Sequence, residues 1–203
     1  STALGYAALF TQNFTTATDS HNVAVGYSAG LSVTTGTKNV FIGSLAGDAI
    51  TASGASVAVG YAALSTEDAH GGSTAIGSEA LTVQNAGATS YNTAVGYQAG
   101  HDVTTGVENT IIGGLAGDAL TDADYNVAVG KSALTADTLG SRSVAIGQSA
   151  LGSQNFTTAT DVYNTAVGMN AGAAVTTGVR NTIIGGLAGD QATTIDDCTI
   201  IGY

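Results

Sequence analysis

The feature that most constrains this chain is a short motif that recurs along all of its 203 residues. Residues 92–117 contain it twice, as an asparagine, a β-branched residue, two apolar residues and a glycine, with alanine three residues after that glycine. The motif glycine stands at Gly5, Gly26, Gly43, Gly60, Gly77, Gly96, Gly113, Gly130, Gly147, Gly168, Gly185 and Gly202. Most steps between these glycines are 17 residues, and the others are 19 or 21. Such a period is typical of a solenoid, in which each repeat forms one coil and stacks on its neighbours.

A longer period is superimposed on the coils. The sequence VTTG recurs at 33–36, 103–106 and 175–178. The residue after the repeated alanine runs Leu, Gly, Gly, Leu and then repeats this order. We therefore predict an all-β fold, a parallel β-roll or β-solenoid of about twelve coils. Residues 1–203 would form one domain with a four-coil super-repeat of 70–72 residues, and we expect this domain to be a segment of a longer fibrous protein.

Each 17-residue coil has room for two strands of about five residues and two turns, with a third short side as a further possibility. The longer coils carry insertions, QNFTTATD at 12–19 and again at 154–161, which we expect to leave the stack as loops. Asn13 and Asn155 begin N-x-[ST] matches inside these insertions. Both remain candidates for glycosylation, although a polar turn is the favoured interpretation.

The motif strand predicts apolar residues on both of its faces. The residue before each glycine is always aliphatic, and the residue before that is alanine, phenylalanine or isoleucine. Because adjacent side chains point to opposite faces and a solenoid has one interior, one apolar face needs a further partner. We therefore predict a homo-oligomer. Its core would contain Val25, Ile42, Val59, Ile76, Val95, Ile112, Val129, Ile146, Val167 and Ile184.

An asparagine precedes the strand in seven coils. These residues are Asn22, Asn39, Asn92, Asn109, Asn126, Asn164 and Asn181. We expect them to stack in line and to satisfy the hydrogen bonds of turn backbone groups. Cys198 occupies the same place, which favours a small buried residue over a functional thiol.

Composition excludes some classes of function. Only 9% of the residues are charged, and the formal net charge is −11, with four Lys and Arg in total. Binding to nucleic acid needs clustered basic residues, so we predict no nucleic-acid partner. The sequence contains no apolar run long enough to span a membrane.

No arrangement of residues predicts catalysis. The three histidines, His21, His70 and His101, lie in different coils, and a thin roll offers no deep pocket. We therefore predict that the protein is not an enzyme and has no cofactor. The weak metal candidates are three aspartates that could provide oxygen ligands for calcium, although corner turns are the favoured interpretation. These aspartates are Asp118, Asp122 and Asp124.

The motif variants resemble the head repeats of trimeric autotransporter adhesins. They include NVAVG at 22–26, SVAVG at 56–60, STAIG at 73–77, NTAVG at 92–96 and SVAIG at 143–147. Similar GYQAG-type repeats occur in phage and virus tail fibres. The resemblance covers the whole chain and implies a left-handed roll packed as a trimer, with the motif strand at the axis. Most coils here have 17 residues and are therefore longer than the repeats of those heads.

The repeats and the resemblance together predict a structural and adhesive protein. We expect the rod or head of an extracellular surface appendage or virion fibre, which displays loops for attachment to a host receptor or glycan. The alternative is a subunit of an extracellular filament that grows end to end through open solenoid ends. Its partners would be copies of itself in either case.

Overall fold

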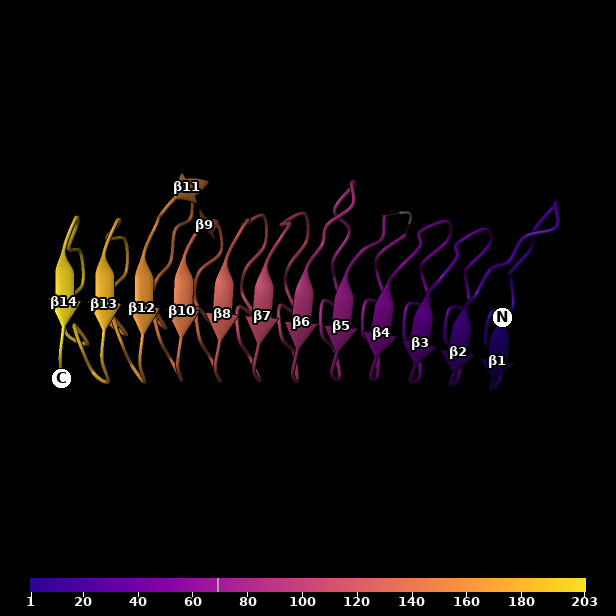
Figure 1. Cartoon of the computed structure of the whole chain (residues 1–203), viewed down its shortest axis with the longest axis horizontal. Coiled ribbons are helices and arrows are strands. Elements are labelled where there is room, and N and C mark those ends of the chain that lie inside the picture. The colour runs from indigo at the N-terminus through magenta and orange to yellow at the C-terminus, as the bar shows by residue number, and fades with distance from the viewer. Residues whose placement is uncertain (69) are drawn as a thin grey trace.

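The computed structural model describes residues 1–68 and 70–203 and shows a single stack of coils. Figure 1 shows the coils following one another in a row from the N-terminus to the C-terminus. The twelve main strands are β1 (Thr2–Leu4), β2 (Val23–Val25), β3 (Val40–Ile42), β4 (Val57–Val59), β5 (Thr74–Ile76), β6 (Thr93–Val95), β7 (Thr110–Ile112), β8 (Val127–Val129), β10 (Val144–Ile146), β12 (Thr165–Val167), β13 (Thr182–Ile184) and β14 (Thr199–Ile201). The predicted all-β solenoid of about twelve coils is confirmed.

These strands form one parallel sheet in the order of the chain. The register pairs each motif residue with the same motif residue one coil later, as in Ala24 with Phe41 and Val25 with Ile42. Backbone bonds continue this pairing beyond the strands, since the Gly43 N–H donates to the Val25 oxygen at 2.8 Å. The motif spacing therefore specifies the strand register.

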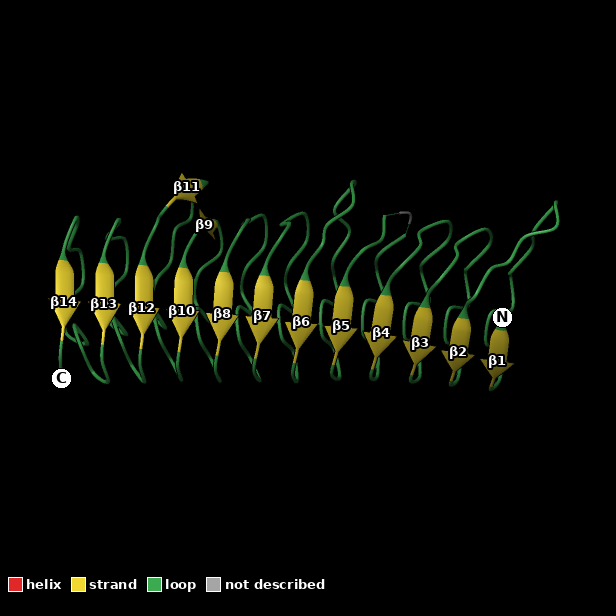
Figure 2. Ribbon diagram, viewed as in Figure 1, coloured by secondary structure: helices red, strands yellow, loops and turns green. Residues whose placement is uncertain are grey.

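The prediction of two strands of about five residues in each coil is wrong. Each coil has one strand of three residues, and turns and loops form most of the remainder (Figure 2). The structure adds only β9 (Gly140–Ser141) and β11 (Thr160–Asp161) among the described residues, and these two pair with each other. Many turn residues have positive φ, including Leu64 at 52° and Tyr125 at 60°, and this bends the backbone away from an extended path.

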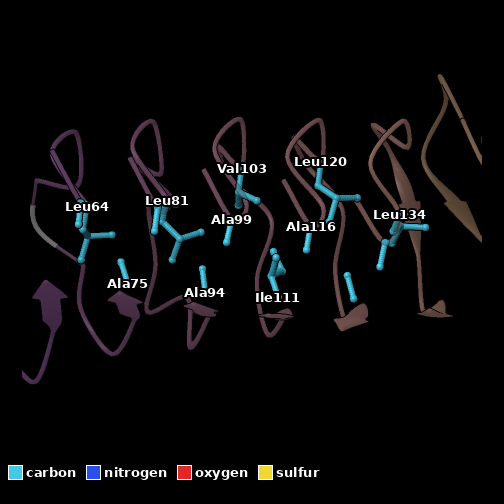
Figure 3. Close-up of a cluster of buried hydrophobic side chains, with 14 of the residues drawn as sticks. Leu64, Ala75, Leu81, Ala94, Ala99, Val103, Ile111, Ala116, Leu120 and Leu134 are labelled. Atoms are coloured by element: carbon cyan, nitrogen blue, oxygen red, sulfur yellow. The ribbon is translucent and has the colours of Figure 1, made fainter. Parts of the chain in front are cut away.

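The interior is a narrow column of aliphatic side chains, part of which is shown in Figure 3. The middle residue of each interior strand points into this column, and Ala94, Ile111 and Ala128 are fully buried. The repeated alanine of the motif, such as Ala99 and Ala116, lies in the same core. Inward and outward positions therefore alternate along the strand as the sequence predicts.

The order Leu, Gly, Gly, Leu along the super-repeat has a packing reason. In two of the four coil types, a leucine such as Leu64 fills the core. In the other two types glycine stands in its place. The strand of one of these two types carries a larger inward residue, which uses the space beside the glycines of both. A β-carbon at Gly47 would lie 2.4 Å from the ring of Phe41, which is fully buried. The glycines therefore make room for Phe41, and equivalent glycines make room for Ile111 and Ile183.

The two identical insertions differ in environment. The first connects β1 to β2 and forms a loop that projects from the N-terminal end of the stack (Figure 1). The second contains β11 and buries Phe156 to 7% exposure. The expectation that insertions leave the stack therefore holds for the first, whereas the second packs against the preceding coil.

Candidate functional site

The candidate functional surface is the outward face of the twelve-stranded sheet. We define this outward face by the first and third residues of each main strand, which are all Thr, Val, Leu or Ile. On the ten interior strands β2–β8, β10, β12 and β13, the third residues are either half-buried valine or isoleucine with 38–41% exposure. No charged residue belongs to this face. The third residues form a continuous aliphatic column, and the first residues beside them are threonine or valine. An uncharged surface with such a column indicates a site of interaction.

All ten predicted oligomer-core residues lie on this outward face. Val25, Val59, Val95, Val129 and Val167 alternate along the stack with Ile42, Ile76, Ile112, Ile146 and Ile184. Their neighbours in the strand, such as Ala145 beside Ile146, are the ones that point into the interior. The sequence thus identified residues that one chain leaves partly exposed, and their burial in an oligomer stays a prediction.

A row of exposed tyrosines flanks the outward face. Tyr6, Tyr27, Tyr61 and Tyr97 each follow a motif glycine, and all are more than half exposed. Tyr6 and Tyr27 stack with ring centroids 5.3 Å apart. This pair therefore packs between neighbouring coils. The rings of Tyr61 and Tyr97 are exposed and available for contacts with another molecule.

The asparagine ladder is present as predicted. The Asn109 N–H donates to Asn92 Oδ1 at 2.8 Å, and the Asn109 side-chain amide donates to the Ala123 oxygen at 2.7 Å. The Asn126 N–H continues the row by donating to Asn109 Oδ1. Cys198 takes the same place, since its N–H donates to Asn181 Oδ1, but the residue is only half-buried, so the expected burial is wrong. The ladder thus satisfies buried turn groups of consecutive coils.

Two buried acid and glutamine pairs were missed from the sequence. Glu67 and Gln84 are both fully buried, and Gln84 Nε2 donates to Glu67 Oε2 at 2.9 Å. One super-repeat later, Gln154 Nε2 donates to Asp137 Oδ2 at 2.5 Å, and both residues are again fully buried. A glutamine 17 residues after an acid is the signal that repeats. We call each pair an acid–glutamine plug.

The plugs lie where the asparagine ladder is replaced by serine. Gln84 Nε2 also donates to Ser90 Oγ at 2.9 Å, and Gln84 Oε1 accepts from Asn92 Nδ2 at 2.8 Å. In the second plug, Gln154 Oε1 accepts from Asn164 Nδ2 at 2.8 Å. Each plug therefore connects the carboxylate to the next segment of the ladder, and supplies the hydrogen bonds that burial requires.

Burial raises the pKa of Glu67, against smaller opposing effects from the hydrogen bonds of the Gln84 amide and the His70 N–H. A carboxyl whose pKa is higher in the folded state contributes stability at low pH, and this contribution is lost as pH rises through that pKa. We expect the free energy of unfolding of the natural protein, minus that of Glu67→Gln, to increase as the pH falls from about 7 to about 4. Urea unfolding at several pH values measures this difference. A difference that is constant, or that grows toward neutral pH, would contradict the assignment.

The structure does not bring the predicted metal candidates to one centre. Asp118 accepts from the Thr135 hydroxyl, Asp122 from the Thr105 hydroxyl and Asp124 from the Val107 N–H. Each carboxylate thus binds a different neighbour. Among the described residues, the one group of three close metal-binding side chains is Glu67, Asp68 and His70, and the Glu67 carboxylate there already belongs to a plug.

The remaining predicted positions lie on the surface. Asn13 and Asn155 are both exposed, as glycan attachment would require. His101 pairs with Asp102 at 2.6 Å on an exposed corner, in a different coil from His21 and His70. The absence of enzymatic activity stays a prediction.

Searches against protein families, curated proteins and solved structures find no match for this chain. Among the described residues, no helix could span a membrane.

Proposed function

We propose that this protein is a structural and adhesive segment of an extracellular or virion fibre. Three copies would pack side by side about a common axis, with their outward faces toward it. Loops such as residues 12–19 would remain on the outside of the rod, where they can meet a receptor or glycan. The observation that carries this proposal is the uncharged outward face with its continuous column of aliphatic third residues.

Electrostatics supports association through this face. The chain has a formal net charge of −11, so most surfaces of two copies repel each other. The outward face contains none of the charged residues and can approach its own copy without burying an unpaired charge.

The size of the face is also consistent with self-association. Twelve coils at about 4.8 Å extend for roughly 55 Å, and three strand residues span about 10 Å, which together give about 500 Å². The apolar part of this area is smaller, because seven of the twelve first residues are threonine, and it lies within the range that a monomer exposes. In a trimer each chain meets two neighbours, and the flanking tyrosine row would extend the contact.

Two adjacent residues test the proposal. Ile146 is 38% exposed on the outward face, whereas Ala145 is fully buried in the core. We expect Ile146→Asp to weaken association by at least about 100-fold, because it buries like charges near the axis, while circular dichroism still shows folded sheet. Sedimentation velocity measures the association.

The control variant is Ala145→Asp, which places a carboxylate in the core. It should remove the fold and the assembly together. An Ile146→Asp protein with the mass and concentration dependence of the natural protein would contradict association through the outward face.

A further inference from the structure

The surface that the first coil presents away from the second contains an unusual polar group. We call this surface the rim, and it includes β1 and Gln12. Gln12 Nε2 is buried and has no hydrogen-bond partner among the described residues. An unpaired buried amide is costly, so this group lacks an acceptor. Because Nε2 is enclosed within the chain, the amide must turn toward the rim to meet an acceptor outside the first coil.

Internal repetition identifies the acceptor. Gln12, Gln84 and Gln154 each stand seven residues after a motif glycine, and the same position of the intervening coils is apolar or acidic. Its occupants are Gln12, Val33, Ile50, Glu67, Gln84, Val103, Leu120, Asp137, Gln154, Val175 and Ala192. Each glutamine that has a coil before it donates to the acid of that coil, as in Gln84 with Glu67 and Gln154 with Asp137.

The serines around the glutamine repeat as well. Ser73 Oγ and Ser90 Oγ are 2.7 Å apart beside Gln84. Ser1 Oγ and Ser20 Oγ are 2.6 Å apart in the coil of Gln12. The first coil therefore contains a glutamine at the plug position and the same serine pair, although Gln12 Nε2 bonds neither serine, and no acid is present.

The identical insertions show what a covering coil would change. Phe156, in the second copy of QNFTTATD, is 7% exposed, and its N–H donates to Asp137 Oδ1 at 2.9 Å. Thr138 Oγ1 of the same preceding coil donates to the Phe156 oxygen at 2.8 Å. Phe14, in the first copy, is only half-buried. The same eight residues thus gain burial and two hydrogen bonds from a coil that carries an acid.

The remainder of the rim consists of the unpaired edge of strand β1 and exposed apolar side chains. All three residues of β1 are exposed, although in the equivalent β10 the middle residue is buried. Tyr6 and Phe10 are about three-quarters exposed at this end and line an open hollow with Leu31. A parallel strand with an aliphatic interior would cover these groups.

We infer that the rim is a docking surface for one further coil of this same pattern, which carries Asp or Glu seven residues after its motif glycine. Of the four coil types in the super-repeat, only the type of Glu67 and Asp137 has this acid. The carboxylate accepts from Gln12 Nε2 and completes a third acid–glutamine plug. This inference does not depend on lateral association.

The test adds a coil to the full chain. Residues 126–142 are copied in front of Ser1, so that Asp137 of the copy faces Gln12 as it faces Gln154 in the natural array. A matched extension copies residues 109–125, which have the same length but place Leu120 at the seventh position. We expect the acid-bearing coil to raise the melting temperature by roughly 4 °C more than the matched coil.

A thermodynamic cycle isolates the contact. Asp137→Leu in the copy should remove most of that extra rise when Gln12 is present, and little of it in the Gln12→Met background. A second cycle combines Glu67→Leu with Gln84→Met in the natural chain, without any added coil. It gives the coupling free energy of a natural plug, with which the Asp137–Gln12 value is compared. Equal effects of Asp137→Leu in the two backgrounds, or an extended chain that melts no higher than its matched control, would overturn the inference.

Discussion

Gly113→Ala is expected to prevent the coils from stacking at the centre of the array. Gly113 has a φ of +135°, a conformation that residues with a β-carbon rarely adopt. A β-carbon there would lie 2.6 Å from both the carbonyl carbon and the oxygen of Gly130 in the next coil. Strain and overpacking together should cost about 3–6 kcal/mol. Urea unfolding followed by circular dichroism measures this loss.

The adjacent residue provides the control. Gly114 is not in the left-handed region, and the nearest atom to an added β-carbon is the Tyr97 oxygen at 3.9 Å. Gly114→Ala should therefore leave the unfolding midpoint nearly unchanged. Equal stability of the two variants would show that close approach of the coils does not require glycine at position 113.

Gln154→Leu is expected to produce the second large loss, because it leaves the buried Asp137 carboxylate without its amide donor. The variant also removes Gln154 Oε1, an acceptor for Asn164 Nδ2. Asp137 Oδ1 keeps the Gly140 and Phe156 N–H donors, and Asn164 Nδ2 keeps the Gly178 oxygen as acceptor. The loss is therefore that of the buried Asp137 Oδ2 partner and of one Asn164 hydrogen bond, which should cost about 2–4 kcal/mol in the free energy of unfolding in urea.

Gln148→Leu serves as the matched control, because Gln148 is exposed in the same coil. It should change the free energy of unfolding by less than about 0.5 kcal/mol. A Gln154→Leu protein as stable as Gln148→Leu would mean that the acid–glutamine plug does not stabilise the fold.

The parts of the fold that follow from one repeated residue type were predictable. The motif glycines define the coils, and the alternation of Ala145 and Ile146 separates the core from the outward face. The asparagine ladder was predictable for the same reason, since Asn92 and Asn109 stand at one position of consecutive coils. Stacking makes every such column a contact.

The plugs were not predictable in this way. Their column changes from glutamine to valine, leucine and acid within one super-repeat, so no single residue type marks it. The strand length was overestimated because positive-φ turns at residues such as Leu64 and Tyr125 interrupt the extended backbone. Non-glycine residues rarely adopt these angles, and neither propensity nor hydrophobic pattern predicts them.

Lateral self-association through the outward face makes a definite prediction for the solution mass of the natural protein. Light scattering coupled to size exclusion should give a discrete particle of three times 19.8 kDa. Electron microscopy of the same sample should show short rods. Long fibres that persist on dilution would instead support end-to-end growth. A particle of 19.8 kDa at all concentrations would contradict the account, because the aliphatic outward face would then be exposed to water.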